Sequence, residues 1–265
     1  MPHRAHASVR PLPGVSMKST RPTSRDIARL AEVSQATVAQ HAFSSGEALA
    51  RNLANVVAAA LERRLAAQGA AGLVVSGGRT PAAFLRELAS RKLDWSNVFV
   101  TLADERCVAS DDPASNLRFV REAFAGAPAA GAALVEFDAT DTDAAFRWSE
   151  ALAQAPRPFA AVILGMGDDG HFASLFPGMP GLAAALDLAN TANVVAGTAP
   201  VEPRARLSLT LPVLLDTDLL VLHVTGDAKL ATLKRAAAHG NRLEIPVRAL
   251  LQQRRVPLEI YHAPR

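Results

Sequence analysis

The sequence predicts an α/β domain of the Rossmann-like, doubly wound type, with a mostly parallel sheet covered by helices on both faces. Short, uninterrupted apolar runs are expected to be buried strands, and they alternate along the chain with amphipathic stretches that carry apolar residues at helical spacing. In addition, a length of 265 residues, of which 49% are hydrophobic, suits one large domain with a short extension.

The first half of the domain is expected to begin with a helix and to continue with two strand–helix units. In order, we expect a helix at 45–68, a strand at 72–75, a helix from Pro81, a strand at 98–102 and a helix after Ser115. The long first helix is indicated by apolar residues that share one stripe. Thr80 is expected to be the N-cap of the next helix, because proline is favoured at the first helical position, which follows it.

The second half continues the alternation with shorter elements. We expect a short strand near Leu134, a helix around 146–152, strands at 160–164 and 219–224, helices at 227–238 and 247–252, and a last edge strand at 257–261. Strands that alternate with helices in this way favour parallel pairing, because a parallel strand pair needs a long crossover connection.

Composition and charge exclude several classes of protein. Cys107 is the single cysteine, which excludes a disulfide framework and a CxxC site and suits a reducing compartment. No apolar run approaches the roughly 18 residues of a membrane span, so we expect a cytoplasmic protein. The first 25 residues hold five basic residues and no acidic residue. Because the net charge of the whole chain is only +3, the rest of the chain is slightly acidic and shows no general nucleic-acid footprint.

Residues 1–41 are predicted to be an extension before a single main domain at 42–265. Residues 1–24 are rich in Pro, Ser and Arg without periodicity, which is typical of a disordered segment, and Met17 is an alternative start. Residues 24–40 resemble a helix–turn–helix, in which Ser34 caps a second helix carrying Val38. DNA binding by this stretch stays open beside a plainer interpretation, a helical extension that rests on the main domain.

Three polar segments, at 76–80, 104–106 and 165–171, each follow directly after a predicted strand. The carboxyl ends of parallel strands lie at one edge of a sheet, and ligands of such folds bind outside that edge. We therefore expect these three segments to converge, although they are far apart in the sequence.

The segment Ser76-Gly77-Gly78-Arg79-Thr80 suits an anion, above all a phosphate. It offers main-chain N–H groups, two hydroxyls and the N-terminus of a helix. Two later cations, Arg206 and Lys229, also fit an anionic ligand. Lys229 lies in the first turn of a helix, where a cation is unfavourably placed and a phosphate would offset that cost. An ordinary glycine-containing turn and solvated surface charges are the plainer alternatives.

His171 ends the third segment and is the candidate general base. The run Gly165-Met166-Gly167-Asp168-Asp169-Gly170 matches the dinucleotide fingerprint, but two carboxylates would stand where a pyrophosphate must lie. A carboxylate close to a histidine can instead fix the tautomer of the imidazole, which suits proton transfer near neutral pH. We expect the glycines to bring His171 to the sheet edge, where it activates water; a histidine that only caps the turn is the alternative.

Other chemistries find no support in the sequence. It has no GxSxG nucleophile elbow, no P-loop and no HExxH motif, and Ser174 lies in an apolar run that indicates packing. Asp168, Asp169 and His171 have no clear partner set for a metal ion. We expect neither a metal nor another cofactor.

Over roughly residues 42–262 the chain resembles the 6-phosphogluconolactonase family. The resemblance rests on Ser-Gly-Gly-Arg-Thr-Pro at 76–81, Asp-Glu-Arg at 104–106 with Ser-Asn at 115–116, Leu-Gly-Met-Gly-Asp-Asp-Gly-His-Phe-Ala-Ser-Leu-Phe-Pro-Gly at 164–178, Arg-Leu-Ser-Leu-Thr at 206–210 and Thr-Gly-Asp-Ala-Lys at 225–229. It implies the fold shared with glucosamine-6-phosphate deaminases, hydrolysis of 6-phosphogluconolactone in the pentose phosphate pathway, and no cofactor.

The resemblance also implies roles for individual residues. By position, His171 resembles the family's proposed catalytic base, and Asp104 and Asp169 are implied to orient the site. The implied substrate and phosphate contacts are Ser76, Gly77, Gly78, Thr80, Arg106, Arg206 and Lys229. Phe172 and Glu202 depart from the family pattern, which has a small polar and a basic residue there.

Two other functions remain as alternatives: a sugar-phosphate isomerase or deaminase on the same fold, and a sugar-phosphate-responsive regulator that uses residues 24–40 on DNA. The expected partner is a small phosphorylated sugar lactone, not a membrane. The expected assembly is a monomer or a small homo-oligomer.

Overall fold

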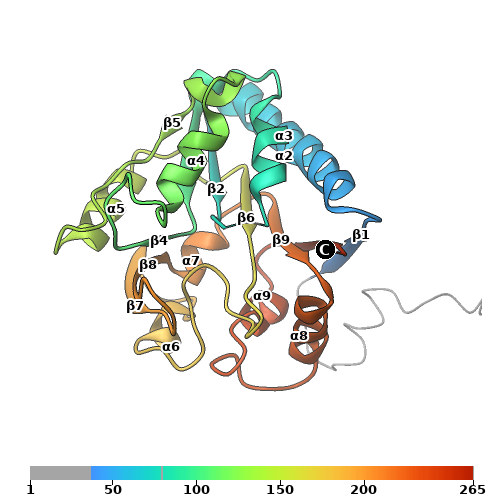
Figure 1. The fold of residues 1–265 in the computed structure, drawn as a ribbon, viewed down its shortest axis with the longest axis vertical. Coiled ribbons are helices and arrows are strands. Elements are labelled where there is room, and N and C mark those ends of the chain that lie inside the picture. Colours follow the sequence, from blue (N-terminus) through green and yellow to red (C-terminus); the bar gives the residue numbers. More distant parts are fainter. Residues whose placement is uncertain (1–36, 79, 265) are drawn as a thin grey trace, which may run out of the picture.

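A seven-stranded sheet runs through the centre of the structure, a computed structural model that describes residues 37–78 and 80–264 (Figure 1). In spatial order its strands are β1 (Val38–Ala42), β10 (Leu258–Ala263), β9 (Leu220–Thr225), β6 (Ala161–Leu164), β2 (Ala71–Val75), β3 (Val98–Leu102) and β5 (Ala133–Leu134). Every neighbouring pair in it is parallel. The predicted doubly wound parallel fold is therefore confirmed.

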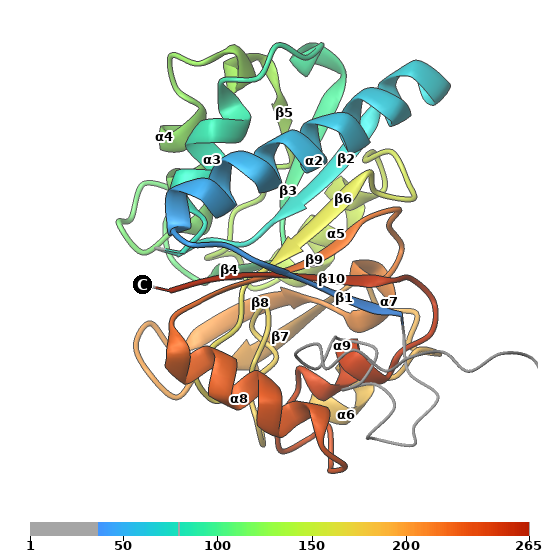
Figure 2. The same cartoon turned by 90° about the vertical axis from the view of Figure 1, so that its right-hand side faces the viewer.

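Helices cover both faces of this sheet, as Figure 2 shows. On one side lie α2 (Gly46–Gln68), α3 (Ala82–Ala89) and α4 (Asn116–Phe124), and on the other lie α6 (Leu182–Ala185), α8 (Asp227–Ala237) and α9 (Arg248–Gln252). The remaining helical elements are α5 (Ala144–Leu152), α7 (Leu211–Leu214) and the short 3₁₀ turns η1 (Trp95–Asn97) and η2 (Pro128–Gly131). Because both faces are covered, β2 and β6 are buried along their whole length, and their apolar runs show no alternation.

A second, three-stranded sheet lies beside the first and was not predicted. It is antiparallel, with β8 (Ala205–Leu209) between β4 (Asp104–Arg106) and β7 (Val194–Thr198). β4 follows β3 after a single residue, so the chain passes from the large sheet directly into the small one. The small sheet therefore holds the segment 104–106 at the carboxyl end of β3.

Two helix starts follow the expected capping chemistry. The Ser45 hydroxyl accepts a hydrogen bond from the main-chain N–H of Ala48, and the Ser115 hydroxyl accepts one from that of Arg118. A hydroxyl in the cap position satisfies an N–H group that has no partner within the helix. The predicted cap at Ser115 is confirmed, and the helix expected from residue 45 begins at Gly46, after a serine cap that was not predicted.

Three local predictions were wrong. Thr80 does not cap α3: the helix begins at Ala82, its cap position is held by Pro81 without a side-chain hydrogen bond, and the Thr80 hydroxyl lies 3.4 Å from that of Thr225. β10 is not an edge strand, because β1 pairs with its outer side. Val38, expected on a second helix, begins strand β1.

The placement of β1 also bears on the predicted boundary between residues 41 and 42. Residues 38–42 pair in parallel register with residues 258–262, so the α/β body already includes the end of the predicted extension. Residues 24–36 of the helix–turn–helix-like stretch at 24–40 lie outside the described residues. Among the residues that are described, no helix combines the length and apolar character needed to cross a membrane.

Candidate active site

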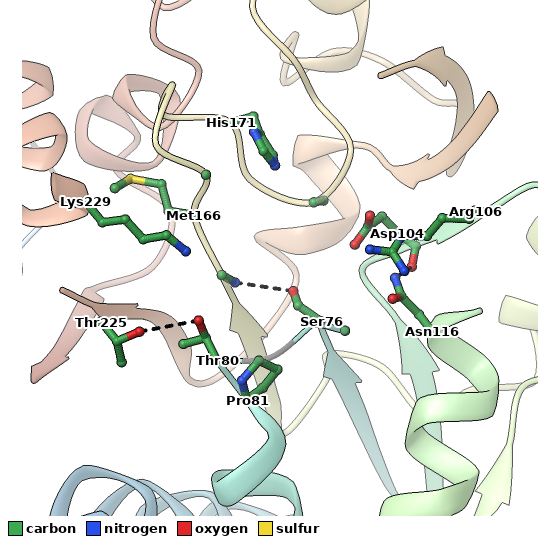
Figure 3. Close-up of a pocket in the computed structure, with 15 residues that line it drawn as sticks. Ser76, Thr80, Pro81, Asp104, Arg106, Asn116, Met166, His171, Thr225 and Lys229 are labelled. Atoms are coloured by element: carbon green, nitrogen blue, oxygen red, sulfur yellow. Dashed lines mark hydrogen bonds between the residues drawn. The ribbon is translucent and has the colours of Figure 1, made fainter. Parts of the chain in front are cut away.

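A cavity of about 670 Å³ opens at the carboxyl ends of β2, β3, β6 and β9 (Figure 3). The three polar segments that the sequence predicted to converge all contribute to its wall. Of the predicted site residues, Ser76, Gly77, Gly78, Thr80, Asp104, Arg106, His171 and Lys229 line this cavity. Asp169 and Arg206 do not: Asp169 is bound to the ring of His171, and Arg206 pairs with Arg106 across two strands.

The loop after β2 is held in place by Ser76. Its buried hydroxyl donates to the carbonyl oxygen of Ile163 at 3.2 Å and accepts from the main-chain N–H of Gly165 at 3.3 Å. This hydroxyl therefore joins the loops that follow β2 and β6. The predicted anion loop and the segment that carries the histidine are thus fixed to each other at their bases.

Gly77 is a position where only glycine fits. A Cβ atom there would lie 1.9 Å from Oδ1 of Asn116, far inside van der Waals contact. The Asn116 amide is buried; its Nδ2 donates to the carbonyl oxygen of Asp104, and its Oδ1 has no hydrogen-bond partner within the described protein. The missing side chain at Gly77 therefore allows the first helical residue of α4 to reach the cavity wall.

His171 points into the cavity from the side opposite Ser76 in Figure 3. Its Nδ1 lies 2.6 Å from Oδ1 of Asp169, and the same oxygen accepts the main-chain N–H of His171 at 3.0 Å. Burial alone would raise the pKa of Asp169, but the hydrogen bond and charge of the His171 ring outweigh it and hold the pKa below its usual value. An ionised carboxylate only accepts hydrogen bonds, so in the neutral form of the ring Nδ1 carries the proton and Nε2 bears the free lone pair.

Gly167 leaves the space that this ring occupies. A Cβ atom at Gly167 would lie 2.1 Å from Cε1 of His171. The ring also packs against Phe176, with 4.4 Å between ring centroids. Of the glycines in the GxGxxG run, Gly167 therefore makes room for the histidine ring.

The cations of the site stand on two walls. Figure 3 shows Lys229, from the first turn of α8, on one side and Arg106, from β4, on the other. The Arg106 guanidinium donates to the carbonyl oxygen of Ala114, which fixes its position. An anion in the cavity can thus meet positive charge from either wall.

Arg206 is placed differently from the expectation. It pairs with Arg106 across β4 and β8, is buried, and donates to the carbonyl oxygen of Pro203. Burial, and then the neighbouring charge of Arg106, lower the pKa of Arg206. In this arrangement Arg206 is not a direct wall of the cavity but a second positive charge beside Arg106, its cross-strand partner.

Glu105 explains why its two neighbours face the cavity. Successive side chains of a strand point to opposite sides, so Glu105 points away from the side taken by Asp104 and Arg106. Its buried carboxylate accepts hydrogen bonds from the main-chain N–H groups of Arg106, Asn116 and Leu117 and from the Ser115 hydroxyl, at 2.7 to 3.0 Å. A carboxylate at a helix N-terminus is also favoured by the helix dipole. Glu105 therefore ties β4 to α4.

Sequence reasoning did not assign roles to three other residues of the wall, Asn116, Met166 and Thr225. Asn116 was noted only as part of a motif, and Met166 and Thr225 read as ordinary turn and strand residues. Among the described residues, no group of three or more His, Cys, Asp or Glu side chains is arranged to hold a metal ion.

The fold and the cavity together define a class of protein: doubly wound α/β proteins with a glycine-containing loop, cations and a carboxylate-bound histidine at the carboxyl ends of a parallel sheet. The sequence model of the family described as glucosamine-6-phosphate isomerases/6-phosphogluconolactonase matches residues 44–258, most of the chain. The chain belongs to that family.

Individual relatives agree with this assignment. A 6-phosphogluconolactonase of Rhizobium meliloti is 43% identical over 227 residues, which are 84% of this chain and 98% of the relative. One of Pseudomonas putida is 43% identical over 232 residues, or 86% of this chain and 94% of the relative. A crystal structure of a 6-phosphogluconolactonase from Shewanella baltica matches with a TM-score of 0.81 and 36% identity, over 86% of this chain and 97% of the other.

Proposed function

We propose that this protein hydrolyses 6-phospho-D-glucono-1,5-lactone to 6-phospho-D-gluconate, the lactonase step of the oxidative pentose phosphate pathway. One observation carries the proposal: a histidine fixed by a carboxylate faces the same cavity as the loop at 76–80 and two cations. The names of the most similar relatives support the same substrate.

The phosphate binds first in this mechanism. The main-chain N–H groups of Gly77 and Gly78, the hydroxyl of Thr80 and the ammonium of Lys229 offer donors and positive charge for it. A phosphate held there places the lactone ring across the cavity toward His171. Positioning of this kind lowers the barrier because the reacting groups no longer have to find each other.

His171 then moves the proton. Its Nε2 accepts a proton from a water molecule as the water oxygen attacks C1 of the lactone, and Asp169 stabilises the imidazolium that forms. The tetrahedral intermediate collapses with cleavage of the bond between C1 and the ring oxygen. The imidazolium returns the proton to that oxygen, which becomes the C5 hydroxyl, and the new carboxylic acid ionises in solution. A lactone is an activated ester, so no covalent nucleophile is needed.

The opposite wall binds the sugar. Asp104 presents a carboxylate that accepts a hydrogen bond from a ring hydroxyl, and Arg106 stands beside it. We propose that the reaction needs no metal or other cofactor. We also propose that residues 42–265, together with the preceding residues of β1 (Val38–Ala42), carry the activity. We further propose that the reaction takes place in the cytoplasm.

The test is a pH-stat or coupled assay on freshly generated 6-phosphogluconolactone, with unphosphorylated gluconolactone as the matched control. We expect rapid hydrolysis of the phosphorylated lactone and a much lower kcat/KM for the free one. Lys229→Met should narrow that difference, because it removes charge only from the phosphate side. Failure to accelerate hydrolysis of the phosphorylated lactone would overturn the proposal.

The family also contains glucosamine-6-phosphate isomerases, so an ammonia-release assay with glucosamine 6-phosphate is the second arm of the test. We expect no ammonia release. Ammonia release without lactone hydrolysis would assign this chain to the other activity of the family.

A further inference from the structure

Ser174 lies in an apolar run, and the sequence assigned it to packing. In the structure its side chain is fully buried, but its Oγ donates a hydrogen bond of 2.6 Å to Oδ2 of Asp104. Asp104 lines the cavity and Ser174 does not. Ser174 is therefore one hydrogen bond removed from the proposed substrate, on the far side of a cavity carboxylate.

The position of Ser174 is itself fixed by the small sheet. Its main-chain N–H donates to the hydroxyl of Ser208 at 3.3 Å, and that hydroxyl donates to the carbonyl oxygen of Leu209 at 3.1 Å. Ser208 is the residue directly opposite Asp104 across β4 and β8. The buried Ser174 and Ser208 and the half-buried Asp104 are therefore linked by hydrogen bonds, and the Ser174 hydroxyl proton is directed to the carboxylate.

The turn between His171 and Ser174 is strained. Ala173, which lines the cavity, has a φ of 48°, a left-handed conformation that residues with a side chain rarely adopt. Such a conformation persists only where the surroundings over-determine it. Here the turn is bound at one end by the contact of His171 with Asp169 and at the other by the contact of Ser174 with Asp104.

We propose that Ser174 is a positioning residue, which holds the Asp104 carboxylate so that Oδ2 is bound to the protein and Oδ1 accepts a hydrogen bond from a hydroxyl of the substrate. The same hydrogen bond anchors the turn that carries His171 to β4. Ser174 thus links the carboxylate that recognises the sugar to the loop that carries the base. The expected effect of Ser174 on the kinetics rests on the proposed function, whereas its effect on the position of the Asp104 carboxylate does not.

A double-mutant cycle tests this role. Ser174→Ala should lower kcat/KM about 10- to 100-fold, the range expected for a hydrogen bond to a charged group. In an Asp104→Ala background the same substitution should cost almost nothing, because the group through which Ser174 acts is gone. Ser174→Thr, which keeps the hydroxyl, should recover most of the loss. Equal losses in both backgrounds would overturn the proposal, since a packing role does not depend on Asp104.

Thr217→Val is the matched control. It removes another buried hydroxyl, which donates to the carbonyl oxygen of Phe159 at 3.0 Å in the turn before β9, at the end of that strand far from the cavity. We expect its kcat/KM to stay at the wild-type value. An equal fall in this variant would attribute the effect of Ser174→Ala to general destabilisation and would overturn the proposal. If Ser174→Ala does not fold, Ser174→Cys, with similar shape and a weak donor, takes its place in the cycle.

A crystal structure of Ser174→Ala separates this proposal from the proposed function. We expect the Asp104 carboxylate to leave its wild-type position. A carboxylate that stays in place would overturn the positioning role, whatever the enzyme hydrolyses. An inactive wild-type protein in which Ser174→Ala displaces the carboxylate would instead overturn only the proposed reaction.

Discussion

Replacing His171 with alanine removes the proposed general base of the reaction. General acid–base catalysis contributes about 10²- to 10⁴-fold, which corresponds to about 3–5 kcal/mol in the activation free energy. We expect a loss of about 10³-fold in kcat, because Asp169 holds the ring with Nε2 directed to the cavity and, among the described residues, no second histidine lines its wall. The phosphate contacts at 76–80 and Lys229 are untouched, so KM should change little.

The assay is lactone hydrolysis at several pH values, together with calorimetric binding of 6-phosphogluconate to show that the cavity is intact. His239→Ala is the matched control, because His239 is exposed and lies outside the cavity wall. A folded His171→Ala protein whose kcat stays within about tenfold of the wild-type value, below the range of acid–base catalysis, would refute the role of base. Loss of product binding in proportion to activity would make His171 a binding residue instead.

Three further perturbations follow from the structure. Glu105→Gln should lower the free energy of unfolding in urea by about 2–3 kcal/mol, because it disrupts a buried carboxylate with four donors. The control is Glu122→Gln, on the exposed side of α4, which should change that free energy by no more than about 0.5 kcal/mol. Similar losses in the two variants would contradict this reasoning. Gly77→Ala should reduce kcat/KM at least about tenfold, because the added methyl would meet an amide oxygen at 1.9 Å and a rise of about 1.4 kcal/mol in the activation free energy is enough for a tenfold loss. The control is Gly46→Ala, whose methyl meets nothing within 4 Å and which should keep full activity. Burial lowers the pKa of His223 from 6.5 to about 4. Between these pH values the unfolded state binds more protons than the folded state, so the free energy of unfolding rises with pH, by at most about 3 kcal/mol. His223→Leu should flatten the dependence of Tm on pH in that window, and an unchanged slope would exclude His223 as its source.

Much of the large sheet could be predicted from the sequence, because its signals are local. β3 was expected at 98–102 and is found there, and α2, expected at 45–68, is found at Gly46–Gln68. An apolar run without alternation indicates a strand buried on both faces, and a stripe at helical spacing indicates a helix, whatever the rest of the chain does. Among the missed strands, β4 is three polar residues long, and the mostly half-buried β1 alternates only weakly.

The candidate site was predicted in part for a related reason. His171, with Asp169 beside it, was recognised because two residues separated by one position must lie close together. Lys229 was placed through the helix that carries it. By contrast, Arg206 was expected to touch substrate but lies outside the cavity wall, and its place beside Arg106 follows from the register of β4 on β8, which no periodicity encodes.

The sequence by itself therefore determined the elements, their order and the edge at which polar loops gather, since these follow from local hydrophobic period, capping and the direction of parallel strands. Only the tertiary structure decided which side chains meet. Ser174 and Asp104 are 70 residues apart and are joined by a hydrogen bond of 2.6 Å. That contact exists because the small sheet brings β4 against β8, and the energy of such a pairing depends on the packing of the whole chain and on no single segment.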